Sequence, residues 1–194
     1  MNRADIAGVI LAAGASTRMG SPKALLEYEG EPFLCRLAKV LDAVCGRVVV
    51  VLGHDADLVR PAVPEGVAIA VNPRPERGML SSLQCGLRAV AGTAAVMFLP
   101  VDYGAVRSES VDRIAVEIGT ADVLVPMYEG RHGHPVCVSW AIADEILALP
   151  VTAQARDVIH RHRASTRYIV VDDPGVVNDV DTPEDYRVLV ELAR

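Results

Sequence analysis

The chain has 194 residues and a formal net charge of −6, with 51% apolar and 23% charged residues. These values are ordinary for a soluble globular protein, and the length is sufficient for one domain with a substantial core. The acidic balance argues against a general nucleic-acid binder, which normally carries a basic patch.

Apolar, β-branched runs alternate with helical patterns along most of the chain. Strands are expected at 6–12, 47–52, 67–71, 94–99 and 166–171, and helices at 33–44, 55–60, 79–90, 108–118, 141–149, 154–162 and 183–192. This alternation predicts an α/β fold, a doubly wound and mainly parallel sheet with helices on both faces. The runs 123–127 and 135–139 are expected to flank a hairpin or long turn. No repeat or linker interrupts the pattern, so we expect one domain over 1–194.

Cysteine usage and the first residues indicate the compartment. The four cysteines form no C-x-x-C pair, which is typical of reduced thiols in a cytoplasmic protein. The first residues lack the basic start and long apolar stretch of a signal peptide. No run approaches the ~18 apolar residues of a membrane span. We therefore expect a cytoplasmic protein that uses neither membrane nor nucleic acid as a partner.

A glycine-rich loop with two cations follows the first strand, and reads LAAGASTRMGSPK over 11–23. Gly14 and Gly20 let backbone N–H groups approach a ligand closely, and Arg18 and Lys23 add positive charge. The loop therefore predicts binding of a nucleotide triphosphate, with an ordinary βα turn as the alternative. The glycine spacing does not fit the Walker motif, and Ala12 stands where the dinucleotide fingerprint has its first glycine.

Carboxylates stand at two places that suit a metal ion. Asp102 follows the fourth strand, where a carboxylate near a phosphate loop suits Mg²⁺, although a turn aspartate is an equal alternative. Asp179 and Asp181 lie on one face of an extended segment. We expect one of them to be a second metal ligand and the other to flank it. The next residues, Thr182 to Asp185, have the pattern of a helix N-cap.

Two further segments are candidates for substrate contacts. Asn72, Gly78 and Ser82 follow the third strand and could contact a base or ribose, whereas a serine there could equally cap the next helix. Gly133 and His134 lie in a turn, where His134 could touch an acceptor substrate or make a structural hydrogen bond. The spacing of the histidines and cysteines matches no zinc site.

These motifs together resemble the MobA-like nucleotidyltransferases, with the molybdenum cofactor cytidylyltransferases as the nearest branch. Residues 11–23 are similar to the family signature L-A-A/G-G-x-S-x-R-M/F-G-x-x-K. Residues 78–86 resemble the base-side segment, 100–102 the metal-carrying strand end, 133–135 the acceptor-side turn, and 179–185 the D-I-D-T-P-E-D ending. The resemblance covers essentially the whole chain, and it implies the fold of nucleotide-diphospho-sugar transferases.

The resemblance also implies roles for individual residues. The implied catalytic residues are Arg18, Lys23 and Asp102, and the implied ligands of Mg²⁺ are Asp102 and Asp179. Gly133 and His134 would contact the acceptor. The implied nucleotide-binding residues are Leu11, Ala12, Ala13, Gly14, Ser16, Arg18, Lys23, Asn72, Gly78, Ser82 and Asp102.

The implied reaction is transfer of CMP from CTP to molybdopterin that carries molybdenum, with release of pyrophosphate. Ala13, rather than glycine, resembles the branch that uses CTP. The implied product is the cytosine dinucleotide cofactor of xanthine dehydrogenase-type molybdenum hydroxylases. Two stretches depart from the family pattern: residues 102–104 lack the proline of Asp-x-Pro, and 151–156 keep only the final Ala-Arg of G-D-x-G-A-R.

Four other functions share these features. A nucleotidyltransferase could use another phosphorylated acceptor, such as a sugar phosphate. A glycosyltransferase could use residues 179–181 as a D-x-D metal motif. An NAD(P)H-dependent oxidoreductase has also been recruited from this fold. Finally, an accessory protein of molybdenum enzymes could bind a nucleotide without turnover. Release of pyrophosphate distinguishes a nucleotidyltransferase, whatever its acceptor, from the glycosyltransferase, the oxidoreductase and the accessory protein.

Overall fold

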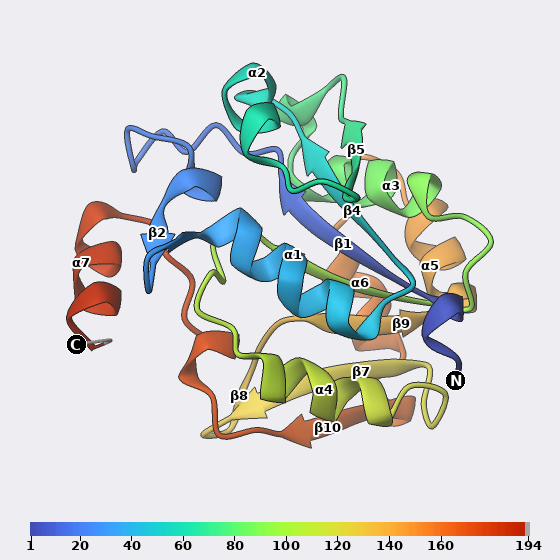
Figure 1. Cartoon of the computed structure of the whole chain (residues 1–194). Helices are drawn as coiled ribbons and strands as arrows, with labels where there is room; N and C mark the ends of the chain where they lie inside the picture. The colour runs from blue at the N-terminus through green and yellow to red at the C-terminus, as the bar shows by residue number, and fades with distance from the viewer. Residues whose placement is uncertain (193–194) are drawn as a thin grey trace.

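A mixed sheet of eight strands forms the centre of the molecule in the computed structural model, which describes residues 1–192 (Figure 1). A separate two-stranded hairpin lies beside it. The strands are β1 (Ile6–Ala12), β2 (Glu27–Tyr28), β3 (Glu31–Pro32), β4 (Arg47–Leu52), β5 (Ala68–Val71), β6 (Ala95–Pro100), β7 (Val123–Tyr128), β8 (Arg131–His132), β9 (Val136–Ser139) and β10 (Thr166–Val170).

The strand order is β10-β7-β9-β6-β1-β4-β5, and β8 pairs with β7. Strands β1, β4, β5 and β6 run parallel, as do β7 and β10. Strand β9 is antiparallel to both of its neighbours, β6 and β7. The expected mainly parallel sheet is therefore confirmed. The runs at 123–127 and 135–139 are indeed antiparallel partners, and one of them is inserted between parallel strands.

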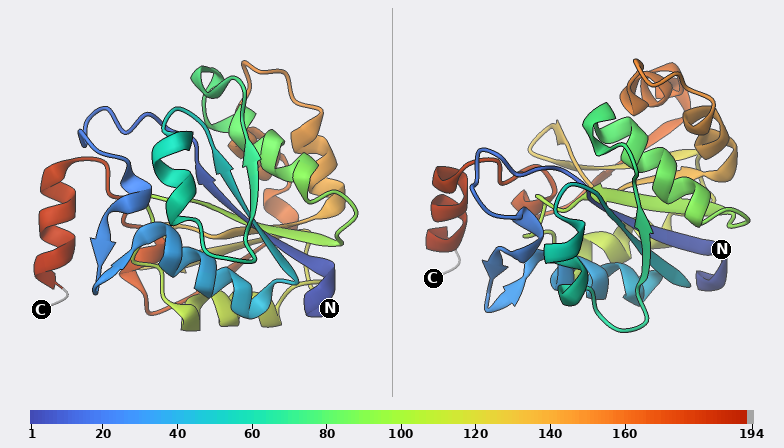
Figure 2. Two further views of the ribbon diagram at one scale, coloured as in Figure 1. Left: turned by 45° about the horizontal axis from the view of Figure 1, so that its top comes forward. Right: turned by 90° about the horizontal axis from the view of Figure 1, so that it is seen from above.

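Helices cover both faces of the sheet (Figure 2). The α-helices are α1 (Phe33–Val44), α2 (Ala56–Val59), α3 (Met79–Ala89), α4 (Ser108–Val116), α5 (Trp140–Leu147), α6 (Ala155–Arg161) and α7 (Pro183–Leu192). Short 3-10 helices lie at Arg3–Asp5, Lys23–Leu25, Arg60–Ala62, Pro75–Arg77, Arg163–Ser165 and Pro174–Val176. Helices α1 and α4 pack on one face, and α3, α5 and α6 on the other.

Alternation along β1 divides the core into two layers. Ile6 and Ile10 pack under α1 and α4, whereas Ala7, Val9 and Leu11 pack under the helices of the opposite face. Every residue of β1 is buried, because a central strand covered on both sides must be apolar throughout. The carboxyl ends of β1, β4 and β6 are thereby held at one edge of the sheet, where an open α/β sheet binds its ligands.

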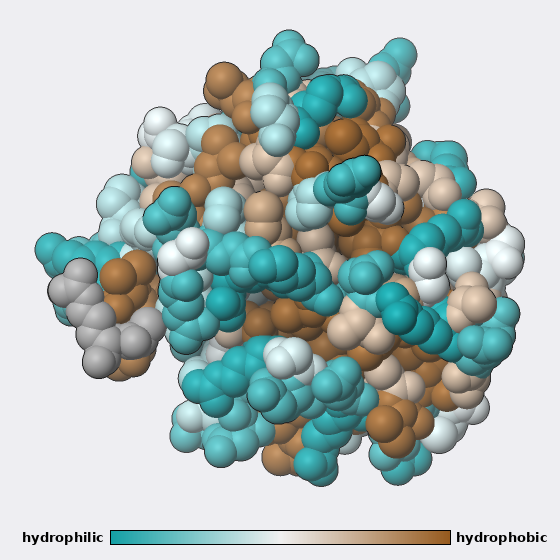
Figure 3. All heavy atoms as spheres, in the orientation of Figure 1, coloured by the Kyte–Doolittle hydropathy of each residue, from teal (hydrophilic) through white to brown (hydrophobic). Residues whose placement is uncertain are grey.

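The last helix stands apart from the two helical layers. It follows the expected N-cap: the Asp185 backbone N–H donates to Thr182 Oγ1 at 3.2 Å, and the Thr182 backbone N–H donates to Asp185 Oδ2 at 2.8 Å. In the space-filling view α7 forms the knob at the left edge, and hydrophilic side chains spread over the neighbouring face with apolar atoms between them (Figure 3). No helix within 1–192 has the length and apolar character needed to cross a membrane.

The expected elements and the observed ones agree in type and mostly in bounds. The first strand, the first long helix and the second strand of the sheet coincide with β1, α1 and β4. The expected helix at 55–60 shortens to α2 because a 3-10 helix, Arg60–Ala62, which contains Pro61, follows it directly. The hairpin of β2 and β3 had no sequence signal strong enough to predict it. Residues 193 and 194 of the expected domain lie outside the described residues.

Candidate active site

The loop after β1 presents a run of unpaired backbone donors. Within the described chain, the N–H groups of residues 13–18 find no acceptor in the protein. The loop closes on Ser16, which has a left-handed φ of 47°, and its carbonyl oxygen accepts from Met19 N–H at 2.9 Å. The Ser16 Oγ accepts from the backbone N–H of Lys23 at 3.1 Å. Such a row of free donors is suited to a polyanion.

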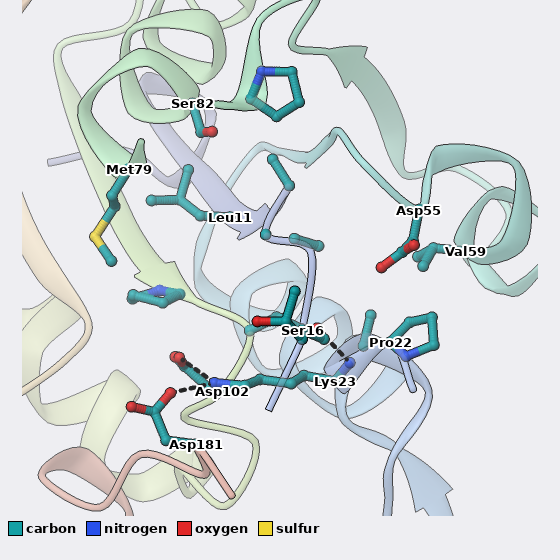
Figure 4. A pocket seen from close by; sticks show the side chains of 18 of the residues that line it. Leu11, Ser16, Pro22, Lys23, Asp55, Val59, Met79, Ser82, Asp102 and Asp181 are labelled. Atoms are coloured by element: carbon teal, nitrogen blue, oxygen red, sulfur yellow. Dashed lines mark hydrogen bonds and ion pairs between the residues drawn. The ribbon is translucent and has the colours of Figure 1, made fainter. Parts of the chain in front are cut away.

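The two cations of the loop meet the acidic segment that precedes α7. Lys23 Nζ lies 3.3 Å from Asp102 Oδ2 and also contacts Asp181 Oδ1 (Figure 4). Arg18 donates to the other oxygen of Asp181 at 2.8 Å. Asp181 therefore bridges both cations, and Lys23 bridges two carboxylates.

Main-chain bonds hold the acidic segment against the end of β6. The Val180 N–H donates to the carbonyl oxygen of Asp102 at 3.0 Å. The Arg131 side chain, from β8, donates to the carbonyl oxygen of Val177 at 2.9 Å. Because side chains alternate in an extended segment, fixing Val180 on Asp102 places the two aspartates on either side of it near the same point.

Three carboxylates converge there. One oxygen from each of Asp102, Asp179 and Asp181 lies within 4.8 Å of the others. Burial raises the pKa of Asp102 above its usual value, although Lys23 opposes the shift, and hydrogen bonding to Lys23 lowers the pKa of Asp181. The Oδ1 atom of Asp102 is buried without a hydrogen-bond partner in the described structure. An all-oxygen set with an unsatisfied carboxylate oxygen fits a hard divalent cation.

A cavity of about 280 Å³ connects this charged cluster to the start of α3. All the predicted nucleotide-binding residues except Asn72 line it. Asn72 is buried behind the cavity, where its Nδ2 donates to Ser81 Oγ at 2.8 Å and to Ser82 Oγ at 3.0 Å. Asn72 therefore positions the two serines. The N-cap of α3 is Gly78, and neither serine caps the helix.

A second, larger cleft of about 1030 Å³ adjoins the first. Both include Leu11, Gly78, Met79 and Pro100 in their walls, so a ligand in one would meet a ligand in the other. Gly133 and His134, the predicted acceptor residues, line the larger cleft. Its wall includes three arginines, Arg77, Arg156 and Arg163, a local positive charge in a chain whose net charge is −6.

His134 is the most unusual group in the larger cleft. Burial lowers its pKa to about 4, so the ring is neutral near pH 7. Its Nδ1 atom is enclosed and has no partner within the described residues, and the ring packs on Tyr103 with the centroids 4.5 Å apart. The alternative of a structural hydrogen bond from this ring is not observed in the part of the chain that the structure describes. The preceding histidine, His132, instead stacks on Tyr168 at 4.3 Å.

The two departures from the family pattern fall in different surroundings. At Gly104 a Cβ atom would lie 2.1 Å from the ring of Phe33, so the Phe33 side chain occupies the space that a proline would need. Asp102 still follows the end of β6, although glycine stands at position 104 where the family pattern has proline. Residues 151–156, the second departure, all line the larger cleft, so their changes alter its wall and leave the charged cluster untouched.

Sequence reasoning underestimated Asp181. We expected one of the two aspartates to flank the metal site, and chose Asp179 as the ligand. In the structure Asp179 and Asp181 both contribute an oxygen to the cluster; Asp179 is exposed, whereas Asp181 also contacts both Lys23 and Arg18. The same-face D-x-D spacing was the available signal, but it cannot tell which carboxylate meets the loop.

The comparisons with known proteins agree with this geometry. Residues 8–166 match the model of the MobA-like NTP transferase domain. The molybdenum cofactor cytidylyltransferase of Escherichia coli is 25% identical over 183 residues, 92% of each chain. The nicotine blue oxidoreductase of Paenarthrobacter nicotinovorans is 31% identical over 196 residues, 95% of this chain and 96% of that one.

Solved structures show the same fold. Rv0371c from Mycobacterium tuberculosis superposes with a TM-score of 0.87 and 31% identity, covering 98% of this chain and all of that one. A complex of Rv0371c with manganese gives a TM-score of 0.80 and 28% identity, over 96% of this chain and 98% of that one. On the family match over most of its length, together with these full-length similarities, the chain belongs to the MobA-like NTP transferase family.

Proposed function

We propose that this protein is a cytidylyltransferase that moves CMP from CTP to a molybdopterin-type molybdenum cofactor and releases pyrophosphate. The observation that carries the proposal is the meeting of the donor-rich loop, Lys23 and three carboxylates at the smaller cavity, which shares part of its wall with the larger cleft. The similarity to the E. coli cytidylyltransferase supports the choice of acceptor, and Ala13 supports the choice of CTP.

In this reaction an oxygen of the acceptor's phosphate attacks the α-phosphorus of CTP. The new P–O bond forms as the bond from the α-phosphorus to the bridging oxygen breaks, and pyrophosphate leaves with that electron pair. The free N–H groups of residues 13–18, Arg18 and Lys23 stabilise the charge that collects on the phosphate oxygens. The nucleophile is already an anion, so the protein need not supply a strong base.

Asp102, Asp179 and Asp181 would hold Mg²⁺, which supplies positive charge to the triphosphate when bound. Lys23 and Arg18 are engaged by Asp181 in the structure. When a triphosphate enters, these cations exchange a carboxylate partner for phosphate oxygens. The basic residues of the larger cleft suit an acceptor with a negative charge, because a cleft of one sign concentrates ligands of the other. We further propose a cytoplasmic molybdenum hydroxylase as the enzyme that receives the product.

The test is a pyrophosphate-release screen of the four NTPs with Mg²⁺, with and without the molybdenum cofactor. The expected result is release with CTP only when the cofactor is present. Pyrophosphate release with a sugar phosphate, and none with the molybdenum cofactor, would mean that the protein is a nucleotidyltransferase with a different acceptor. Faster pyrophosphate release with another NTP would mean that this NTP, and not CTP, is the substrate.

The second candidate is an oxidoreductase, favoured by the 31% identity to nicotine blue oxidoreductase. The retained Lys23 and carboxylate cluster argue for the transferase, because hydride transfer has no need of a triphosphate site. Oxidation of NADH or NADPH by the protein with an aromatic acceptor, without pyrophosphate release, would support the second candidate instead.

A further inference from the structure

The carbonyl oxygen of Ala13 is held by two donors from one residue. It accepts from the backbone N–H of His54 at 3.3 Å, and the His54 Nδ1 atom lies 3.2 Å from it. A carbonyl oxygen can only accept, so Nδ1 carries the proton in this contact. Both lone pairs of the Ala13 oxygen are therefore used within the protein, away from any ligand.

The turn after β4 is built for this close approach. A Cβ atom on Gly53 would lie 2.5 Å from the Ala13 oxygen and 2.8 Å from the Ala13 methyl carbon. Only glycine at 53 lets the two chain segments touch in this way. Ala13 as a whole is 3% exposed, so its methyl group is also fixed by packing. The Gly53–His54 turn thus fixes Ala13 in two ways: His54 hydrogen-bonds to its carbonyl oxygen, and Gly53 packs against its methyl group.

Fixing that carbonyl also fixes what the cavity offers to a ligand. The peptide bond between Ala13 and Gly14 is trans and planar, so the Gly14 N–H points opposite to the Ala13 carbonyl. Ala13 and Gly14 both line the smaller cavity, and their N–H groups have no acceptor among residues 1–192. At this position the cavity presents hydrogen-bond donors.

We propose that His54 is a positioning residue for base selection, acting through the Ala13 peptide; the inference rests on the proposed binding of CTP. Cytosine offers two adjacent acceptors, O2 and N3, to a pair of N–H donors. Uracil differs at that edge, because its N3 carries a hydrogen that needs an acceptor. The Ala13 carbonyl is hydrogen-bonded to His54, so the Ala13–Gly14 peptide cannot rotate to offer its oxygen to that hydrogen. Buried polar groups left unpaired by the wrong ligand are an effective source of discrimination.

The experiment measures equilibrium binding of CTP, UTP and inorganic triphosphate, each with Mg²⁺, by titration calorimetry. It compares the unaltered protein with His54→Leu, which keeps the backbone N–H and removes the side-chain donor. His54 is exposed, so the substitution leaves the core intact. His54→Asn places an amide nitrogen two bonds from Cβ, as Nδ1 is, and serves as the conservative variant. His162→Leu, a histidine that pairs with Glu145 on the other side of the sheet from α1, is the matched control.

The expected result is that the unaltered protein binds CTP more tightly than UTP, and that His54→Leu reduces this preference about fivefold, the worth of one hydrogen bond. The preference returns in His54→Asn and is unchanged in His162→Leu. Affinity for inorganic triphosphate, which has no base, stays the same in all four proteins. A loss of triphosphate affinity equal to that for CTP would show that His54 merely supports the loop, and would overturn the proposal.

Two other outcomes separate this inference from the proposed function. If the unaltered protein binds nucleotides and His54→Leu keeps the full preference for CTP, the role of His54 is wrong and the transferase stands. Equal affinity of the unaltered protein for CTP and UTP would likewise refute the role of His54 and leave the transferase proposal standing. If the unaltered protein binds no nucleotide and releases no pyrophosphate, both proposals fail.

Discussion

His134 shows how one residue can carry chemistry that its sequence position only hints at. The sequence placed it in a turn with two possible roles, substrate contact or a structural hydrogen bond. In the fold its Nδ1 atom is enclosed without a partner in the described residues, in the wall of the larger cleft. A buried polar atom with no partner costs stability, so a group retained in that state is a candidate for ligand contact.

The same residue makes folding sensitive to acid. Its pKa in the folded state is about 4, below the ordinary 6.5, so between these values the unfolded chain binds a proton that the folded chain does not. Stability therefore falls as pH decreases through that window, and is unaffected by this group above it. From pH 7.5 to 5 the loss from His134 is about 2 kcal/mol.

Urea unfolding at the two pH values, on the unaltered protein and His134→Gln, measures this loss. We expect the variant to lose about 2 kcal/mol less than the unaltered protein over that interval. Measurements at pH 7.5, where the ring is neutral in both states, provide the reference for each protein. The same loss in both proteins would contradict the buried, neutral histidine.

At the scale of elements, the segment before α7 is positioned by bonds from three directions. Val180 bonds to Asp102, Arg131 bonds to Val177, and Asp185 Oδ2 accepts from the backbone N–H groups of Asp181 and Thr182 at 3.1 and 2.8 Å. The N-cap was predictable because its residues are neighbours in sequence. The bonds to Asp102, after β6, and from Arg131, in β8, were not predictable, because they join residues far apart in the chain.

We predict that Asp185→Ala loosens both the helix start and the metal site. The variant loses the acceptor for three donors, including Thr182 Oγ1 at 2.8 Å, so its midpoint of thermal unfolding falls by a few degrees. Its affinity for Mn²⁺, measured by titration, also falls because Asp181 is less well held. Glu184→Ala is the control, since within residues 1–192 Glu184 forms an ion pair with Arg187 alone, on the exposed surface of the same helix. Equal effects of the two substitutions would disprove the role of the cap.

At the scale of the whole molecule, the site joins four parts of the chain that the sheet brings to one edge. The loop after β1, the end of β6, the start of α3 and the segment before α7 all contribute to it. Lys23 links three of them, because its ammonium group lies between Asp102 and Asp181. The Lys23 ammonium group places a positive charge among these carboxylates.

We therefore predict that Lys23→Met reduces pyrophosphate release at least a hundredfold, since it removes a cation from the developing charge. The variant is also less heat-stable than the unaltered protein in EDTA, because the carboxylates repel one another without the lysine. Added Mg²⁺ raises its midpoint of unfolding by more than it raises that of the unaltered protein. Asp102→Asn is the counterpart: it removes one carboxylate, and Mg²⁺ stabilises it less. An equal metal response in all three proteins would rule out the shared site.

The sequence by itself determined the order of the helices and of most strands, the loop after β1 and the cap of α7. These features depend on neighbouring residues, through hydrophobic periodicity and local hydrogen bonds. It also put Arg18, Lys23 and Asp102 forward as candidates. Only the tertiary structure decided three sets of contacts. Asp181 pairs with both Arg18 and Lys23. Asn72 donates hydrogen bonds to Ser81 and Ser82, and His54 hydrogen-bonds to the carbonyl oxygen of Ala13. Those contacts join residues distant in the chain, and their geometry depends on the twist and packing of the entire sheet.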